Sequence, residues 1–367
     1  MFKKIAILCL VMLISLITCL TAVSSNNNMI PALFQTEENL LKDYVEGLPD
    51  IEITLAHNDV ADPTQLIQAM SLAFKESVET GSSGKISVTI SPGGALGNTN
   101  ELMEQTMTGE IQMTDVTEGS LAIIFPDIQV ISIPYLFNSI EQANEVWRGS
   151  FGVEMFEEMR KATGLKVVNT YAGGFRNFTN SVRPIRTPED MKGLKIRTMD
   201  IPAHMEIVRS LGAVATPIPW GEVYTSLQTG VVDGQENAIP SIIIGSLQEV
   251  QSYMVEDGHV YTQEFLIMND AWFNGLPEIY QFIIMQGAER AGYIGDRAAR
   301  VAEDKGIEVL SKNMEIYTPT MEEIAMFREA TQDKVLEFIK GDIDNPEWID
   351  KILEAAEEAN KKLGYTN

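Results

Sequence analysis

The chain has 367 residues, of which 45% are hydrophobic and 22% charged, so it has the composition of a folded globular protein and enough length for two lobes. Its formal net charge of -25 gives a surface that repels nucleic-acid phosphates, and nucleic acid is therefore not expected as a partner. A small anionic ligand is compatible with this charge, because a few arginines in a cleft can dominate the local field.

Residues 1–24 have the pattern of an export signal. Lys3 and Lys4 precede an apolar run over residues 5–20, and small residues at positions 22 and 24 complete a cleavage pattern. The run is shorter than a comfortable membrane span. The sequence therefore predicts an exported, periplasmic protein.

A lipid anchor at Cys19 is the alternative, because residues 16–19 (LITC) resemble a lipobox. The only other cysteine, Cys9, also lies in the signal segment. The mature protein is therefore expected to contain no disulfide, no cysteine nucleophile and no zinc–thiolate site.

After a polar lead-in over residues 25–50, strands and helices alternate along the chain. Asp62 and Pro63 predict a helix start as N-cap and first helical residue, and Asn98 and Glu101 predict a capping box before the next helix. The expected strands are 51–55, 86–90, 166–171, 194–198 and 213–218, and the expected helices are 62–81, 98 onward, 140–163, 187 onward, 202–211, 222–229, 277–310 and 320 onward. This alternation predicts an α/β fold.

We find no stretch of the chain that matches a known sequence motif for catalysis, metal binding or cofactor binding. Residues 81–85 (GSSGK) have too few positions between the glycines for a phosphate-binding loop, and residues 92–97 lack dinucleotide spacing. His57, His204 and His259 are isolated in sequence, although two of them could meet in space. We therefore expect no catalytic site, no metal and no cofactor.

One stretch of the chain is specific to a known family. The pieces GFR at 174–176, PEDMKGLKIR at 188–197, LGAVATP at 211–217 and EVYTSLQTGVVDGQEN at 222–237 resemble the solute receptors of TRAP (tripartite ATP-independent periplasmic) transporters. Upstream, LG at 96–97 and IPYLF at 133–137 match as well. The sequence departs at 238–240 (AIP), because family members usually place the proline directly after the asparagine.

The resemblance implies a two-lobed, periplasmic-binding-protein-like fold with crossing strands, a hinge at Gly173 and Gly174, and a long helix bracing both lobes. The implied division is residues 51–173 plus about 263–302 for lobe 1, and residues 174–262 plus about 303–367 for lobe 2.

It further implies that Arg197 pairs with a ligand carboxylate, that Arg176 adds a second cationic contact, and that Asn237 hydrogen-bonds the same group. A planar guanidinium grips a carboxylate with two parallel hydrogen bonds, which lysine cannot do. The alternative for Arg197 is a structural ion pair with one of the many acids.

Further candidates surround these three residues. Trp220 stands where relatives carry an aromatic residue facing the ligand, and a core tryptophan is the alternative. The other candidates lie at predicted strand ends or helix starts, where open α/β folds place ligand contacts, and each could also be a cap or loop residue: His57, Asn58, Asn98, Thr117, Glu118 and Tyr135. Glu222, Asp233 and Glu236 are expected to have structural roles.

The sequence therefore predicts a non-enzymatic receptor that captures a small organic acid by hinge closure and delivers it to the small and large membrane subunits of a TRAP transporter. A sensory receptor on the same fold and an exported hydrolase are the alternatives.

Overall fold

The computed structural model describes residues 41–365, so the export signal, Cys19 and most of the polar lead-in lie outside the described residues. One nine-stranded sheet runs through the molecule in the order β2-β1-β3-β8-β4-β7-β5-β6, with β9 paired to β8. The strands are β1 (Ile51–Ala56), β2 (Ile86–Ser91), β3 (Met113–Thr117), β4 (Leu165–Asn180), β5 (Lys195–Thr198), β6 (Val214–Pro217), β7 (Gly234–Ala238), β8 (Tyr253–Asn269) and β9 (Glu315–Tyr317).

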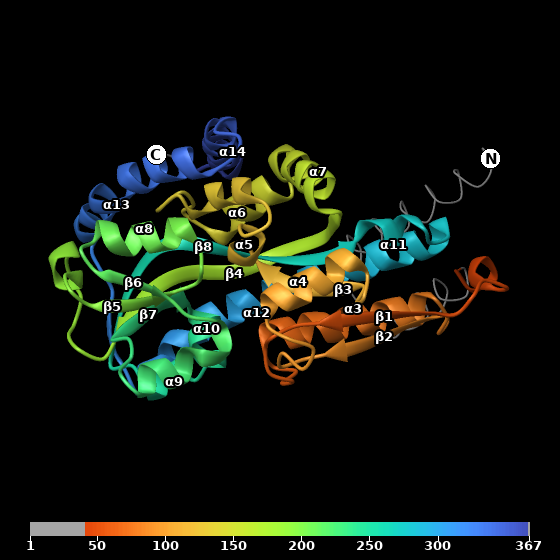
Figure 1. Cartoon of the computed structure of the whole chain (residues 1–367), viewed down its shortest axis with the longest axis horizontal. Helices are drawn as coiled ribbons and strands as arrows, with labels where there is room; N and C mark the ends of the chain where they lie inside the picture. Colours follow the sequence, from red (N-terminus) through yellow and green to blue (C-terminus); the bar gives the residue numbers. More distant parts are fainter. Residues whose placement is uncertain (1–40, 366–367) are drawn as a thin grey trace, which may run out of the picture.

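Two long antiparallel strands connect two groups of parallel strands. β1 pairs in parallel with β2 and β3 at one end of the sheet, and β5 pairs in parallel with β6 and β7 at the other. β4 and β8 pass between the groups, and Figure 1 shows them running across the molecule. We call the β2-β1-β3 end lobe 1 and the β7-β5-β6 end lobe 2. The predicted two-lobed α/β fold with crossing strands is thereby confirmed.

Helices cover both faces of this sheet. They are α3 (Leu66–Gly81), α4 (Thr99–Thr108), α5 (Glu118–Leu121), α6 (Ile140–Trp147), α7 (Ser150–Thr163), α8 (Pro202–Ser210), α9 (Val223–Gln228), α10 (Ile239–Ile244), α11 (Asp270–Asn274), α12 (Glu278–Leu310), α13 (Met321–Asp342) and α14 (Glu347–Leu363). Within residues 41–365, no helix has both the length and the apolar character needed to cross a membrane.

The long helix α12 packs against α3 in lobe 1, against the crossing strand β4, and against α10 in lobe 2. Small residues permit this close approach, because a Cβ atom at Gly295 would overlap the ring of Tyr171, and one at Gly292 would overlap Asn169. The helix predicted over residues 277–310 therefore exists and braces both lobes.

Several predicted boundaries were wrong. The helix expected over 140–163 is interrupted at Arg148 and Gly149, giving α6 and α7. α3 starts at Leu66 with Gln65 as N-cap, because the Asp62 carboxylate instead accepts hydrogen bonds from the backbone and hydroxyl of Thr64 in a local turn.

The joint expected at Gly173 and Gly174 is a shift of strand register inside β4, between Ala172 and Gly174, and the chain stays extended through it. The start expected at Thr187 forms its capping box, but only one 3-10 turn follows, Pro188–Met191.

Candidate functional site

Arg176 lies on the crossing strand β4 and is almost fully buried. Its Nε and Nη2 atoms pair with the carboxylate of Glu236 on β7, Nη2 also donates to the Glu236 carbonyl (2.6 Å), and Nη1 donates to Thr262 Oγ1 (3.0 Å). The antiparallel register of β4 and β7 sets this pair, because Phe178 lies opposite Glu236 and Arg176 opposite Ala238. Burial lowers the pKa of Arg176, but the Glu236 carboxylate outweighs it, so the pKa lies above its usual value.

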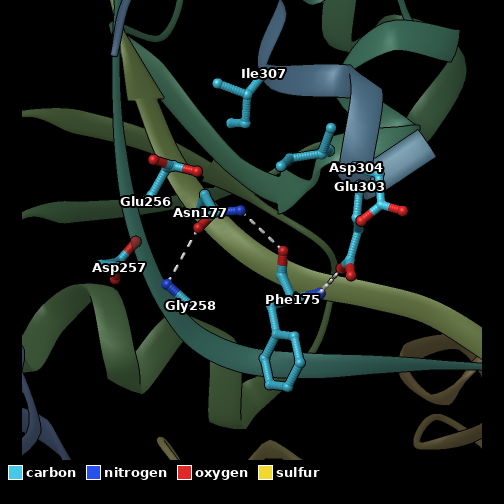
Figure 2. Close-up of a pocket in the computed structure, with 9 residues that line it drawn as sticks. Phe175, Asn177, Glu256, Asp257, Gly258, Glu303, Asp304 and Ile307 are labelled. Carbon is cyan, nitrogen blue, oxygen red and sulfur yellow. Dashed lines mark hydrogen bonds between the residues drawn. The ribbon is translucent and has the colours of Figure 1, made fainter. Parts of the chain in front are cut away.

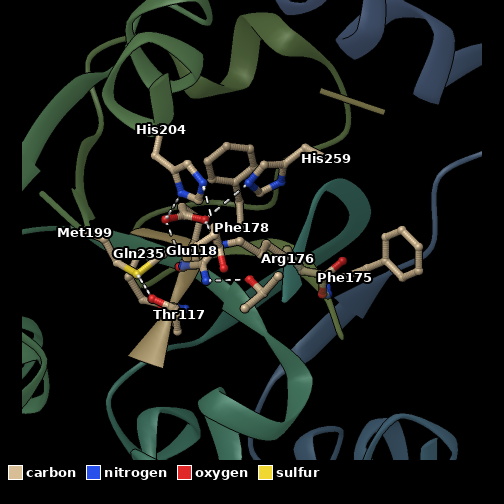
Figure 3. A network of polar contacts seen from close by, with 12 residues as sticks. Thr117, Glu118, Phe175, Arg176, Phe178, Met199, His204, Gln235 and His259 are labelled. Carbon is tan, nitrogen blue, oxygen red and sulfur yellow. Dashed lines mark hydrogen bonds and ion pairs between the residues drawn. The ribbon is translucent and has the colours of Figure 1, made fainter. Parts of the chain in front are cut away.

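Two histidines from distant parts of the chain, His204 and His259, meet at Glu236. Figure 3 shows both imidazole rings in the same polar network. His204 on α8 has its Nδ1 3.5 Å from Glu236 Oε1, and His259 on β8 has its Nε2 3.4 Å from Glu236 Oε2. His259 Nδ1 lies 2.9 Å from Asp257 Oδ2, and its ring stacks on Phe178.

The pKa values of this group diverge. Burial raises the pKa of Glu236, but Arg176 and the histidines outweigh it and hold the pKa well below its usual value. Burial lowers the pKa of His259, but Asp257 and Glu236 raise it to about 9, whereas burial lowers the pKa of His204 despite Glu236. His204 and His259 are isolated in sequence, yet the fold brings them together in space.

Across residues 41–365, no group of three or more His, Cys, Asp or Glu side chains is arranged to hold a metal ion.

Glu118 brings lobe 1 to this network. It is the first residue of α5, directly after β3, and its Oε2 accepts a hydrogen bond from the backbone N–H of Gln263 (3.2 Å). Its Oε1 lies 4.0 Å from His204 Nε2. Burial raises the pKa of Glu118 to about 7, although Arg176 lowers it.

Arg197 stands at the end of β5 and differs from Arg176 in its partners. Its Nε and Nη2 donate to the carbonyl of Ile218 (2.8 and 2.7 Å), while the buried Nη1 finds no hydrogen-bond partner among residues 41–365. No carboxylate of the described chain pairs with it. Burial lowers its pKa to about 10, with Glu236 opposing that effect. One edge of this buried guanidinium is held by a carbonyl, and the other edge has no acceptor within the described chain. This arrangement favours the binding of an anion over the alternative role of Arg197, a structural ion pair.

Asn237 is buried on β7 and lies opposite Asn177 of β4. Its side-chain amide makes no hydrogen bond to any other described residue. It alternates with Glu236 along the strand, so the two side chains point to opposite faces.

The lobe 1 candidates divide into two groups. His57, Asn58 and Asn98 make contacts within lobe 1: His57 Nε2 is 2.9 Å from Gln68 Oε1, the Asn58 amide is 2.6 Å from Thr99 Oγ1, and Asn98 caps α4 in the expected capping box. Their ligand role stays a prediction.

Thr117 and Tyr135 lie nearer the network. Thr117 Oγ1 donates to Met199 Sδ (3.7 Å) just after β5, so it faces lobe 2. Tyr135 has a left-handed backbone (φ 58) and donates its N–H to the His259 carbonyl (2.9 Å), while its ring lies under Arg328 of α13. The structure therefore brings together Thr117, Glu118, Arg176 and, through its backbone, Tyr135.

Trp220 is half-buried at the edge of a small core cluster beneath α9 and α10. Trp220→Ala should lower the free energy of unfolding by about 1–2 kcal/mol, below the 3–5 kcal/mol of a core tryptophan. Trp147→Ala, at a position 1% exposed, is the matched control and should reach the higher range. Urea unfolding of both variants measures the difference. Equal losses would place Trp220 in the core and remove it from the ligand site.

A cavity of about 330 Å³ lies on the other side of β4 (Figure 2). Phe175 and Asn177 line it and alternate with Arg176, so the cavity and Arg176 lie on opposite faces of the strand. Its remaining lining residues are Ile239, Glu256, Asp257, Gly258, Glu303, Asp304 and Ile307. With four acids and no base, this cavity is unsuited to a carboxylate.

Sequence reasoning missed His204, His259, Asp257 and Thr262. Their partners are far along the chain, for example 60 residues between Arg176 and Glu236 and 86 between Arg176 and Thr262. The one local signal was the spacing of Asp257 and His259, two residues apart on β8.

Comparison with known proteins places this arrangement in a family. A family model described as bacterial extracellular solute-binding protein, family 7, matches residues 56–342. A solute-binding protein of Roseobacter denitrificans is 32% identical over 80% of this chain and 89% of its own length. The 2,3-diketo-L-gulonate-binding periplasmic protein YiaO of Escherichia coli is 30% identical over 63% of this chain and 70% of its own. Among solved structures, the sugar acid binding protein DctPAm of Advenella mimigardefordensis, in complex with galactonate, has a TM-score of 0.80 at 30% identity, covering 85% of this chain and 99% of that one.

Proposed function

This chain belongs to the bacterial extracellular solute-binding proteins of family 7, the TRAP-type receptors that its motifs indicated, and we propose that it captures a small organic acid between its lobes and delivers it to the membrane subunits of a transporter. Members of this family bind solutes and are not enzymes. Delivery to the small and large membrane subunits, and a periplasmic location, are proposed from family membership.

The observation that carries this proposal is that Arg197 is buried without a carboxylate partner from the described chain. The residue is 2% exposed, and burying a cation without a partner is costly. Nη1 has no partner within the described chain, so a ligand carboxylate would supply the missing acceptor. Arg176 is proposed to take part in the same site, chiefly by its positive field, because Glu236 and Thr262 already hold most of its N–H groups. The contact of Asn237 with the same carboxylate stays a prediction, because its side chain points to the face opposite Glu236.

The class of acid is proposed from relatives of similar sequence. YiaO is named for 2,3-diketo-L-gulonate, and the similar solved structure holds galactonate. Both compounds combine one carboxylate with several hydroxyl or carbonyl groups. We therefore propose sugar acids and related hydroxy acids as the first compounds to test.

Binding requires motion of the lobes. Arg176 and Arg197 are both at most 2% exposed, so a ligand reaches them only after the lobes separate. The connections between the lobes include the crossing strands β4 and β8, with α12 lying across them. A ligand that contacts both lobes would shift the population toward the closed form.

A panel of ligands tests the proposal by thermal unfolding and small-angle scattering. We expect at least one acid among galactonate, galacturonate, erythronate, 2,3-diketogulonate and succinate to stabilise the protein, by about 2.7 kcal/mol at 100 times its dissociation constant. Galactose is the control, because it keeps the hydroxyl groups and lacks the carboxylate. The radius of gyration should fall when the binding acid is added. An acid that binds tightly without compaction would refute hinge closure, and stabilisation by galactose equal to that by galactonate would refute carboxylate recognition.

A further inference from the structure

Segments from the two lobes touch directly beside the arginines. Thr117 of lobe 1 contacts Met199 of lobe 2, and a Cβ atom at Gly119 would collide with the side chain of Ile201. Glu118 lies between these positions and faces His204 on α8. Glu118 and His204 therefore meet across the boundary between the lobes.

The two facing atoms both lack other partners. Glu118 Oε1 and His204 Nε2 lie 4.0 Å apart, both are buried, and neither makes a hydrogen bond to another described residue. The opposite atom of each group is occupied, since Glu118 Oε2 accepts from the Gln263 N–H and His204 Nδ1 faces Glu236 Oε1. Each remaining atom is therefore directed toward the other.

The position of the proton follows from Glu236. That carboxylate is ionised, because Arg176 pairs with it, so its Oε1 accepts and His204 Nδ1 donates. A neutral His204 with its proton on Nδ1 has a bare lone pair on Nε2. An ionised Glu118 would oppose that lone pair with a second acceptor, whereas a protonated Glu118 would donate to it.

We propose that Glu118 is held as a neutral carboxylic acid whose Oε1–H is directed to His204 Nε2, and that this proton makes Glu118 a specificity residue for anionic ligands. The surrounding charges agree. Glu236 on β7 and Glu264 on β8 are acids near Glu118, while Arg176 on β4 is the cation whose charge favours its ionised form, and burial, the largest effect, favours the neutral form.

The consequence for binding rests on the proposed function. The cation that acts on Glu118 is Arg176, which the proposed function assigns to the ligand site through its positive field. An ionised Glu118 would offset that field. A carboxylate bound in the field of Arg176 would raise the pKa of Glu118 further, so binding would take up a proton, and affinity should fall as the pH rises above about 7, by at most about tenfold per pH unit.

Infrared difference spectroscopy on the full, ligand-free protein tests the proton directly. Subtracting the Glu118→Gln spectrum from the wild-type spectrum at pH 6 should reveal the C=O band of a neutral carboxylic acid, and most of this band should be gone at pH 8.5. Glu101→Gln removes an exposed capping carboxylate and should reveal only an ionised carboxylate. An ionised carboxylate in the Glu118 difference at pH 6 would overturn the proposal.

Nitrogen NMR of the three histidine rings provides a second measurement on the unsubstituted protein, in case Glu118→Gln fails to fold. His204 should be neutral and protonated on Nδ1 at pH 6 to 7. A doubly protonated His204 in that range would overturn the proposal, because the proton would then reside on the imidazole.

Titration with galactonate at pH 6.5, 7.5 and 8.5 tests the link to binding. The wild-type affinity should fall as the pH rises, while that of Glu118→Gln should stay within about twofold, since its amide cannot ionise. An equal pH dependence in both proteins would refute the specificity role. Failure of galactonate to bind at any pH would count against the proposed ligand class and leave the spectroscopic result standing.

Discussion

Replacing Arg197 by methionine should weaken binding of the acid identified in the ligand panel by about thirtyfold to several thousandfold. In the proposed closed site the carboxylate would be desolvated, and removing the charge that pairs with such a group typically costs about 2–5 kcal/mol. Isothermal titration calorimetry measures the loss. Unchanged affinity would show that Arg197 does not bind the carboxylate.

Arg197→Lys should recover only part of that affinity. In the structure one edge of the guanidinium donates twice to the Ile218 carbonyl, while Nη1 has no partner within residues 41–365. A single ammonium group cannot hold Ile218 and present a second edge to the ligand in the same geometry. Arg209→Lys, at an exposed position on α8, is the matched control and should leave affinity unchanged.

The ligand-free stability of the Arg197 variants separates the ligand role from a structural one. The free energy of unfolding of Arg197→Met should stay within about 1 kcal/mol of wild type, because the lost hydrogen bonds to Ile218 are offset by the relief of burying an unbalanced charge. A structural ion pair would give the opposite pattern, with a large loss of stability and a secondary loss of affinity.

Features that depend on neighbouring residues could be predicted from the sequence. The capping box at Asn98 forms as expected, and the helix start expected at residue 320 has one as well, because such a box needs only a side chain and a backbone group three residues apart. The long apolar stripe of α12 likewise predicted one continuous helix. At Thr187 the box forms, yet only a single turn follows, so a capping signal fixes where a turn begins and leaves its length open.

Features that depend on strand order could not be predicted in the same way. β8 is buried on both faces and lies between β3 and β4, which are far from it in sequence, so its residues lack the alternation of a half-exposed strand. The pairing of Arg176 with Glu236 follows from the register of β4 against β7, and no local pattern contains that register. Family resemblance indicated Arg176 and Arg197 together, and only the structure distinguishes Arg176, which pairs with a carboxylate, from Arg197, which has no carboxylate partner within residues 41–365.

The second prediction with a large expected effect concerns the stability of the folded protein, not its affinity for a ligand. Glu236→Gln should lower the free energy of unfolding at pH 7 by about 3–5 kcal/mol, because removing one partner of a buried ion pair leaves Arg176 uncompensated. Glu236 also accepts from both His204 and His259, so the loss is not confined to one contact. Urea unfolding measures it. Glu357→Gln breaks an exposed pair with Lys361 and should cost less than about 1 kcal/mol.

The pH dependence of this loss identifies its cause. The pKa of His259 is raised to about 9 in the folded protein, so its contribution to stability is complete below about 6.5 and is lost as the pH rises from there to about 9. Glu236 has a lowered pKa, so its contribution is present above about 4.5 and is lost as the pH falls through the lowered value. Removing Glu236 takes away one of the two carboxylates that raise the pKa of His259, so Glu236→Gln should lose less stability than wild type between pH 6.5 and 9. Parallel alkaline losses in the two proteins would show that His259 is charged independently of Glu236, and the buried network would then consist of separate pairs.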